Sequence, residues 1–149
     1  MYQKVLSPEK GKRIWGCMSH YVVSILANSL DKNIEPIFFE YVINFPAGIY
    51  YYGYNKSVRT LPETFASVKT SAYLRMVKLL TTYSNKNCMD KLYFIKEWLE
   101  SNKIDDNIWD LGKASKDNIL FPLSDTWRKD EYRIQDCTYI INELIENIG

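Results

Sequence analysis

The feature that most constrains this chain is an amphipathic segment ending in an acidic turn with a tryptophan, NCMDKLYFIKEWLESNKIDDNIWDLG. Leu92, Ile95 and Leu99 recur at helical spacing, which predicts one continuous helix with a buried stripe. The short polar side chains that follow bond to nearby backbone and end helices. Because a fully exposed indole is unfavourable, we expect Trp109 to fold back against the end of this helix.

The order of these residues resembles the repeat of the squalene cyclase and prenyltransferase superfamily, in which a helix is followed by a Gln and then by Asp-Gly-Ser-Trp. Lys91–Trp109 is the matching unit, and Trp98-Leu99 stands where the family has an aromatic-Leu pair. Asn102 stands near the repeat's glutamine and Asp106-Asn107 near its Asp-Gly. The resemblance covers a single repeat. It implies paired antiparallel helices of an α/α toroid and implies nothing about chemistry.

Composition bounds the class of protein. The chain has 149 residues, which suits one domain, and its hydrophobic content of 46% and aromatic content of 15% supply a sizeable core. A net charge of +1 gives no reason to expect nucleic acid or an anionic membrane as partner. No apolar run is long enough for a membrane span, and no signal-peptide core follows the charged start. Three cysteines without close spacing predict reduced thiols in a cytoplasmic protein.

Apolar periodicity predicts an all-α fold, an antiparallel helical array or small bundle of four to five helices in a single domain, 1–149. By the resemblance, this array is part of an α/α toroid. Residues 1–14 form an extended lead-in, and 103–128 form a long packed loop. Residues 49–54 are expected to be a loop, because the sequence predicts no second strand that could pair with them. Helices are expected at Trp15–Leu30, at Glu35–Val42, at Thr64–Tyr83, from a cap at Asn87 to Ser101, and at Asp130–Ile148.

Cys17 and His20 form a C-x-x-H pair that shares one face if the segment is helical. Thiolate and imidazole are zinc ligands, and Asp136 and Cys137 are candidates to complete a site. The prenyltransferase zinc residues follow another order, Asp-x-Cys with a later His, so they do not carry over. Nucleophilic catalysis by Cys17 lacks a surrounding motif. We favour the simpler interpretation, in which the cysteines are core residues and His20 bonds a carbonyl or faces water.

Five aromatic residues are candidates to line a pocket for an apolar or sugar ligand: Tyr50, Tyr51, Tyr52, Trp109 and Trp127. Aromatic clusters stack on such ligands, but they also build ordinary cores, and we favour the core. The acidic residues near Trp109 do not have the spacing of the family's Asp-rich motifs. We therefore interpret Asp105, Asp106 and Asp110 as a capping and turn network.

No complete catalytic set is visible, so the favoured function is a non-catalytic binding or protein-interaction module of the α/α toroid type. One alternative is an enzyme or enzyme subunit resembling terpenoid cyclases and prenyltransferases, with an aromatic-lined pocket. Another is a metal-binding module through Cys17 and His20. No cofactor is expected. An open array of few helices leaves apolar faces uncovered, so self-association or binding to another protein chain is expected, and an apolar small molecule is a further candidate partner.

Overall fold

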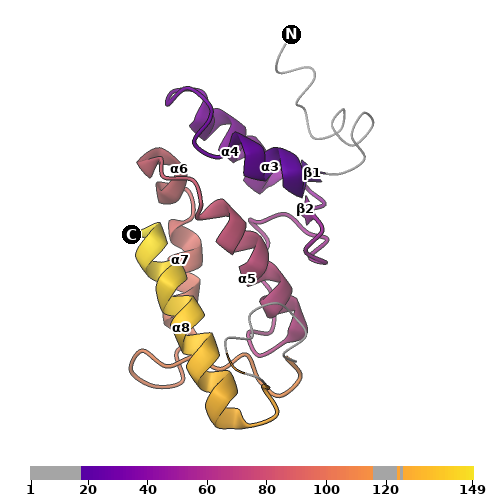
Figure 1. The fold of residues 1–149 in the computed structure, drawn as a ribbon, viewed down its shortest axis with the longest axis vertical. Coiled ribbons are helices and arrows are strands. Elements are labelled where there is room, and N and C mark those ends of the chain that lie inside the picture. Colours follow the sequence, from indigo (N-terminus) through magenta and orange to yellow (C-terminus); the bar gives the residue numbers. More distant parts are fainter. Residues whose placement is uncertain (1–17, 116–123, 125) are drawn as a thin grey trace.

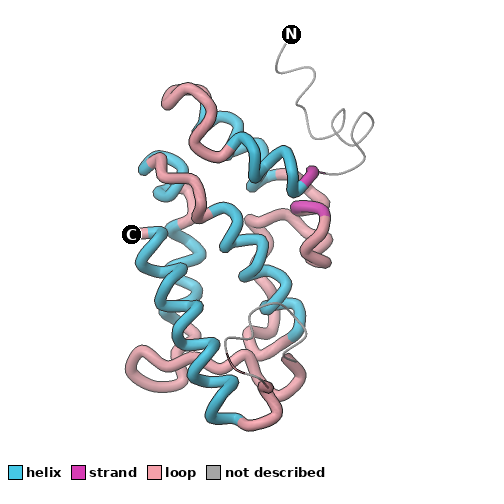
Figure 2. Tube along the Cα trace, viewed as in Figure 1, coloured by secondary structure: helices cyan, strands magenta, loops and turns pink. Residues whose placement is uncertain are grey.

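The computed structural model describes residues 18–115, 124 and 126–149. This part of the chain is 51% helical, with six helices and a sheet of two short strands (Figures 1 and 2). The predicted all-α class is confirmed in its main feature, and the small sheet is an addition to it. The predicted lead-in over residues 1–14 lies outside the described residues.

The sheet joins two segments that lie far apart in the sequence. Strand β1, Met18–Ser19, pairs in parallel with strand β2, Ile49–Tyr50. Met18 is opposite Ile49, and both side chains are buried. The prediction that residues 49–54 form only a loop was therefore wrong at its start. The partner strand was missed because two residues carry no period-2 pattern of their own.

The first two helices are α3, His20–Leu26, and α4, Glu35–Asn44. The predicted helix at residues 15–30 is shorter than expected, because Asn28 has a φ of 60° and turns the chain away after α3. Asparagine tolerates this left-handed conformation. Its side-chain Nδ2 donates to the carbonyl of Thr82 at 2.8 Å, and its Oδ1 accepts from the backbone N–H of Ser84 at 2.7 Å. Asn28 thus ties the α3–α4 turn to the turn that follows α5.

Helix α5 spans Val68–Leu80 and starts later than predicted. Ser67, not Thr64, is its N-cap: the Ser67 backbone is extended, and its Oγ accepts from the backbone N–H of Thr70 at 3.3 Å. The carbonyl of Thr64 instead accepts from the hydroxyl of Ser67 at 2.7 Å. The loop before α5 therefore folds against the helix start.

The helix predicted from Asn87 is two helices, α6, Lys86–Asp90, and α7, Tyr93–Ser101. The cap is Asn85, whose Oδ1 accepts from the backbone N–H of Asn87 at 3.0 Å. Between α6 and α7 the chain changes direction (Figure 1). Apolar side chains are buried on both sides of the break, so the bend keeps both groups in the core.

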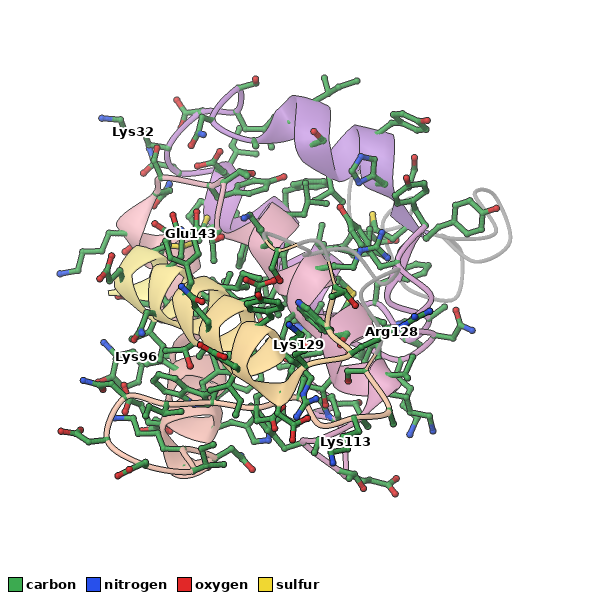
Figure 3. All side chains as sticks on the ribbon, turned by 60° about the horizontal axis from the view of Figure 1, so that its bottom comes forward. Lys32, Lys96, Lys113, Arg128, Lys129 and Glu143 are labelled. Atoms are coloured by element: carbon green, nitrogen blue, oxygen red, sulfur yellow. The ribbon has the colours of Figure 1, made fainter. Side chains whose placement is uncertain are left out.

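Helix α8, Asp130–Ile148, has the predicted bounds. Its buried face packs against α7 and α6. Three other residues of α8 are only half-buried: Ile134, Thr138 and Ile145. Figure 3 shows α8 on one side of the molecule, with Lys129 labelled near its start and Glu143 toward its other end.

A single hydrophobic core links β1 through α8 within the described residues. Further contacts join α6 to α4 and α3 to α5. The largest side chains in the core are aromatic, and their polar atoms are bonded inside the protein. The hydroxyl of Tyr73 donates to the carbonyl of Val58 at 2.8 Å, and that of Tyr83 to the carbonyl of Val23 at 2.6 Å. The described part of the predicted loop 103–128 packs on this core through Trp109, Leu111 and Trp127.

Candidate functional site

Trp109 lies at the end of α7, as the sequence predicted. Its ring is fully buried, and its Nε1 donates to the carbonyl of Leu99 at 2.7 Å. Its backbone N–H donates to the Thr138 hydroxyl on α8 at 3.1 Å. The ring therefore pins the acidic turn to two helices. Two of the three acidic residues make the predicted turn contacts: Oδ1 of Asp105 accepts from the backbone N–H of Asp106 at 2.7 Å, and Oδ1 of Asp110 accepts from that of Gly112 at 2.8 Å.

Trp127 is also buried, and its Nε1 donates to Oδ2 of Asp136 at 2.7 Å. The same oxygen accepts from the Ser124 hydroxyl at 2.7 Å. This carboxylate therefore holds the segment before α8 in place. Its neighbour Cys137 is buried, and burial raises the pKa of its thiol to about 12, which disfavours the thiolate that metals and electrophiles need.

The candidate metal pair is described only in part, because Cys17 lies outside the described residues. His20 is half-buried, and its Nδ1 lies 2.7 Å from the Tyr52 hydroxyl. That partner is a tyrosine hydroxyl, not the carbonyl or water that the sequence suggested. Among residues 18–115, 124 and 126–149, no group of three His, Cys, Asp or Glu side chains is placed to hold a metal ion.

The five aromatic candidates have unlike environments. Tyr52, Trp109 and Trp127 are buried, whereas Tyr50 is 69% exposed and Tyr51 is 65% exposed. Two pockets of the described surface, one between α4 and α6 and one along α8, are lined by other residues. Tyr51 and Tyr52 do contact other side chains at the surface. We take this group of contacting side chains as the candidate functional site.

We name this grouping the tyrosine cluster; its members are His20, Tyr21, Tyr51, Tyr52 and Arg75. The ring centroid of His20 lies between 5.3 and 5.4 Å from the centroids of all three tyrosines. Tyr51 and Tyr52 are T-shaped at 5.7 Å, a favoured aromatic geometry. The cluster joins residues from α3, from the turn after β2 and from α5.

Arg75 supplies the charge of the tyrosine cluster. Its guanidinium carbon lies 5.8 Å from the ring centroid of Tyr51 and 5.4 Å from that of Tyr52, within cation–π range. Within the described part of the chain, no carboxylate forms an ion pair with Arg75. Burial lowers the pKa of Arg75 and raises that of Tyr52, because both charged forms lose water.

The backbone at Tyr51 is strained. Its φ is 101°, a region that side-chain-bearing residues rarely adopt. The turn is fixed at both ends. Tyr50 pairs in the sheet before it, and Gly53, with a φ of 74°, follows it. Gly48 lets the backbone at Tyr54 and Lys56 lie close to it, because a Cβ there would lie 2.5 Å from the carbonyl oxygen of Lys56. Strain of this kind is concentrated at functional sites.

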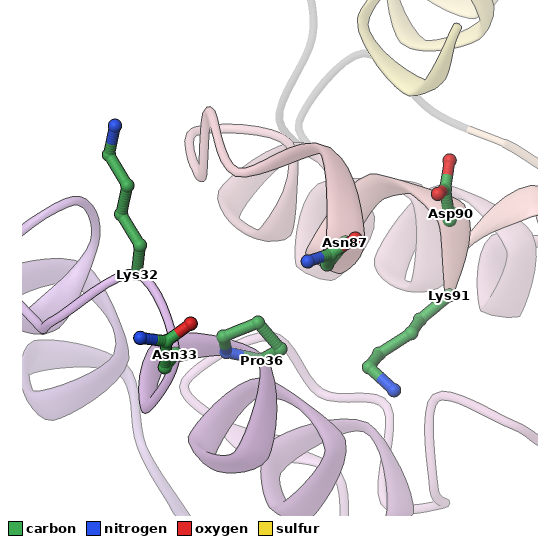
Figure 4. A pocket seen from close by; sticks show the side chains of 6 residues that line it. All are labelled: Lys32, Asn33, Pro36, Asn87, Asp90 and Lys91. Carbon is green, nitrogen blue, oxygen red and sulfur yellow. The ribbon is translucent and has the colours of Figure 1, made fainter.

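A separate, open pocket of about 490 Å³ lies between α4 and α6 (Figure 4). Lys91 lines it, and its Nζ pairs with Glu40 at 2.8 Å. Burial disfavours the Glu40 carboxylate, but hydrogen bonds from Lys91, Asn44 and Arg59 outweigh it and lower the Glu40 pKa to about 2. Of the two lysines that line this pocket, Lys91 is therefore already paired within the protein.

Sequence reasoning missed Tyr21 and Arg75 as members of the site and gave His20 a different role. The usable signal was Arg75 itself, which is half-buried and is one of two charged residues, with Lys78, inside the largely apolar run YLRMVKLL of α5. A charge in such a run requires a partner close to the core. The sequence contains no signal that this partner would be the tyrosine turn.

Comparison with protein-family models, with curated proteins and with solved structures finds no match for this chain. None of the helices in the described ranges is long and apolar enough to cross a membrane.

Proposed function

We propose that this protein is a non-catalytic protein-interaction module that binds its partner through the tyrosine cluster. The observation that carries the proposal is the exposure of Tyr21, 72%, and Tyr51, 65%, in one cluster with Arg75. The Arg75 guanidinium lies over the Tyr51 ring and forms no ion pair with a carboxylate of the described residues. Tyrosine and arginine are enriched at the centres of protein interfaces, where they supply most of the binding energy.

The cluster is ordered before any partner arrives. The ring contacts around His20 and its hydrogen bond with Tyr52 hold the exposed tyrosines in fixed positions. Aromatic side chains held in this way lose little conformational entropy on binding. Ile25, 71% exposed and one helical turn from Tyr21, extends the apolar area along α3.

The chemistry of the cluster specifies the partner. Arg75 provides a positive charge that forms no ion pair with a carboxylate of the described residues, and the tyrosines provide apolar faces with hydroxyl groups. The complementary ligand is a protein segment that carries a carboxylate next to apolar side chains. A bidentate carboxylate contact is the strongest interaction open to a guanidinium.

Within this proposal, the helix–Asp–Trp unit that resembles the toroid repeat has an architectural role. What supports it is the buried Trp109 at the end of α7, which links the acidic turn to α8. The helix–Asp–Trp unit then serves packing, and binding falls to the α3–β2 end of the molecule. No specific observation favours the enzyme or metal-binding alternatives, so we advance neither.

The test is selection from a random peptide library displayed on phage, followed by anisotropy measurements with the selected peptides. We expect acidic peptides with apolar flanks, and a Kd weakened about tenfold or more by Tyr21→Ser or Arg75→Gln. Tyr93→Ser is the matched control, since Tyr93 is 49% exposed and also has a cation, Lys96, over its ring. Selected peptides that bind all three variants as well as wild type would refute the proposal.

A further inference from the structure

His20 contacts all three tyrosines of the tyrosine cluster, and it is the single histidine of the chain. Its side chain is half-buried, so part of the ring remains in water, and its Nδ1 lies 2.7 Å from the hydroxyl oxygen of Tyr52. Histidine is the side chain whose charge ordinarily changes between about pH 5 and about pH 8. The charge of the tyrosine cluster therefore depends on the protonation state of one ring.

The contact between His20 and Tyr52 suits both states of the ring. A tyrosine hydroxyl both donates and accepts hydrogen bonds, so it can pair with a neutral Nδ1 of either kind. In the imidazolium both ring nitrogens are donors. Nδ1 then donates to the Tyr52 oxygen, and the hydroxyl hydrogen of Tyr52 is available for another acceptor. Protonation of His20 thus adds a positive charge and leaves a donor available beside it.

The protonated ring and Arg75 share the same two tyrosines. The His20 centroid lies 5.3 Å from that of Tyr51 and 5.4 Å from that of Tyr52. The guanidinium carbon of Arg75 lies 5.8 Å and 5.4 Å from the same two centroids. The ring faces attract each cation, while the two positive charges repel each other. A ligand carboxylate at the cluster offsets that repulsion, so it should bind the protonated form more tightly.

The position for this carboxylate is not taken by a carboxylate of the described residues. Neither His20 nor Arg75 forms an ion pair in the described ranges. Tyr50 of β2 has no ring contact with His20 in this part of the chain. The titratable side chains that do contact the His20 ring come from α3 and from the turn after β2: Tyr21, Tyr51 and Tyr52.

Other charged groups on the neighbouring helices are engaged elsewhere. On α4, a carboxylate oxygen of Glu35 accepts from the backbone N–H of Asn28 at 2.7 Å, past the end of α3. On α5, Lys78 forms an ion pair with a carboxylate of α8 at 3.0 Å. Lys69 is exposed in the first turn of α5, about 9 Å along the helix axis from Arg75. Arg75 is therefore the charge of α5 that acts together with the histidine.

We propose that His20 is the second cation of the tyrosine cluster, and that binding of an acidic partner is coupled to the uptake of a proton at His20. This inference rests on the proposed function, since it concerns the same ligand carboxylate. Affinity for an acidic segment then rises as the pH falls from about 7.5 to about 5.5. By thermodynamic linkage, the bound carboxylate also moves the titration of His20 to higher pH.

This pH window separates histidine from the other titrating side chains. Carboxyl groups ordinarily titrate near about pH 4 and thiols above about pH 8. Burial raises the pKa of Cys88 and of Cys137 to about 12, farther from the window. Against the effect of burial, hydrogen bonds lower the pKa of Glu40 to about 2. The carboxylate of a peptide ligand likewise stays almost fully ionised down to about pH 5.5.

The experiment uses the full chain and peptides selected on it from the displayed library at both pH values. Anisotropy should show that wild type binds an acidic peptide at least about fivefold more tightly at the lower pH. For His20→Gln the difference should be less than about twofold, because its amide bonds the Tyr52 hydroxyl but takes up no proton. The matched ligand is the same peptide with its carboxylate replaced by an amide, which should bind wild type without this pH dependence. Thermal melts by circular dichroism confirm that His20→Gln is folded.

Two further measurements count the proton and locate it. Calorimetric titrations near about pH 6.5, in buffers with different heats of ionisation, give the number of protons taken up per bound peptide. That number should be positive for wild type and near zero for His20→Gln. The NMR signal of the single histidine ring should titrate at higher pH when the peptide is bound.

The outcomes distinguish this inference from the proposed function. Peptides that bind equally well at both pH values, yet lose affinity for Arg75→Gln, would leave the proposed function intact and overturn the role of His20. A pH dependence that persists in His20→Gln would also overturn that role, because the proton would then bind elsewhere. A library that yields no peptide at either pH would overturn both.

Discussion

The guanidinium of Arg133 forms two parallel hydrogen bonds with the carboxylate of Asp110. Nε donates to Oδ1 at 2.6 Å and Nη2 donates to Oδ2 at 2.7 Å. Arg133 lies on α8 with a side chain 3% exposed, and Asp110 lies just after Trp109. The Arg133 side chain holds the pKa of Asp110 below its usual range, and Asp110 in turn raises that of Arg133. This pair joins the acidic turn to the start of α8.

Breaking this pair from one side should be strongly destabilising. We expect Asp110→Ala to lower the free energy of unfolding by about 3–5 kcal/mol, because it leaves the buried Arg133 charge without its main partner. The double change Asp110→Leu with Arg133→Met should cost less than Asp110→Ala. Urea unfolding measures both. The control Glu143→Gln removes the exposed Lys78–Glu143 pair and should cost less than about 1 kcal/mol.

Acid should weaken the fold partly through Glu40. Its pKa falls from 4.5 to about 2 on folding, so the folded state prefers the charged carboxylate. That contribution is present above pH 4.5 and is lost as the pH falls toward 2. We expect the melting temperature of Glu40→Gln to depend less on pH across this window than that of wild type. Glu63→Gln is the control, because the Glu63 side chain is 91% exposed. Parallel pH curves for Glu40→Gln and wild type would contradict this prediction.

The elements that the sequence predicted well are those whose signal is local. Helix α8 has both an apolar stripe and acidic residues in its first turn, and its bounds were correct. The break between α6 and α7 was missed, because the apolar pattern continues across it and buried residues lie on both sides of it. Propensity alone cannot find such a bend.

The candidate site was harder to predict, because its members come from three segments. His20, Tyr51 and Arg75 meet only after β1 has paired with β2 and α3 has packed on α5. The tyrosine run was visible, and it was interpreted as a core or a pocket lining. The Arg133–Asp110 pair spans 23 residues and a turn, so no helical spacing pointed to it.

Trp109 should be the most important indole of the described chain. Trp109→Ala removes a fully buried ring and should cost about 3–5 kcal/mol in the free energy of unfolding. Trp109→Phe keeps most of the buried area and removes only the indole donor, while the Leu99 carbonyl still accepts from the backbone N–H of Asn102, so it should cost less, about 1–3 kcal/mol. Trp98→Ala is the control, since Trp98 is only half-buried. Equal losses for Trp98→Ala and Trp109→Ala would remove the special role of the Asp-Trp turn.

The strain at Tyr51 gives a prediction that separates stability from binding. Tyr51→Gly and Tyr51→Ala remove the same ring and the same contact with Arg75. Only alanine keeps a Cβ at a φ of 101°, so we expect Tyr51→Gly to be more stable than Tyr51→Ala by about 1 kcal/mol. At ordinary positions of negative φ, alanine is the more stable of the two. Chemical denaturation of both variants measures the difference.

Binding should not follow that order. Both variants lack the exposed ring, so peptides selected on wild type should bind Tyr51→Gly and Tyr51→Ala equally weakly, despite their different stabilities. Tyr50→Ala supplies the comparison, since Tyr50 is 69% exposed, lies in β2 and has no ring contact with the described members of the tyrosine cluster. It should retain more affinity than either Tyr51 variant. If binding instead tracked stability across all three, Tyr51 would act only through the fold, and its strained conformation would have no part in recognition.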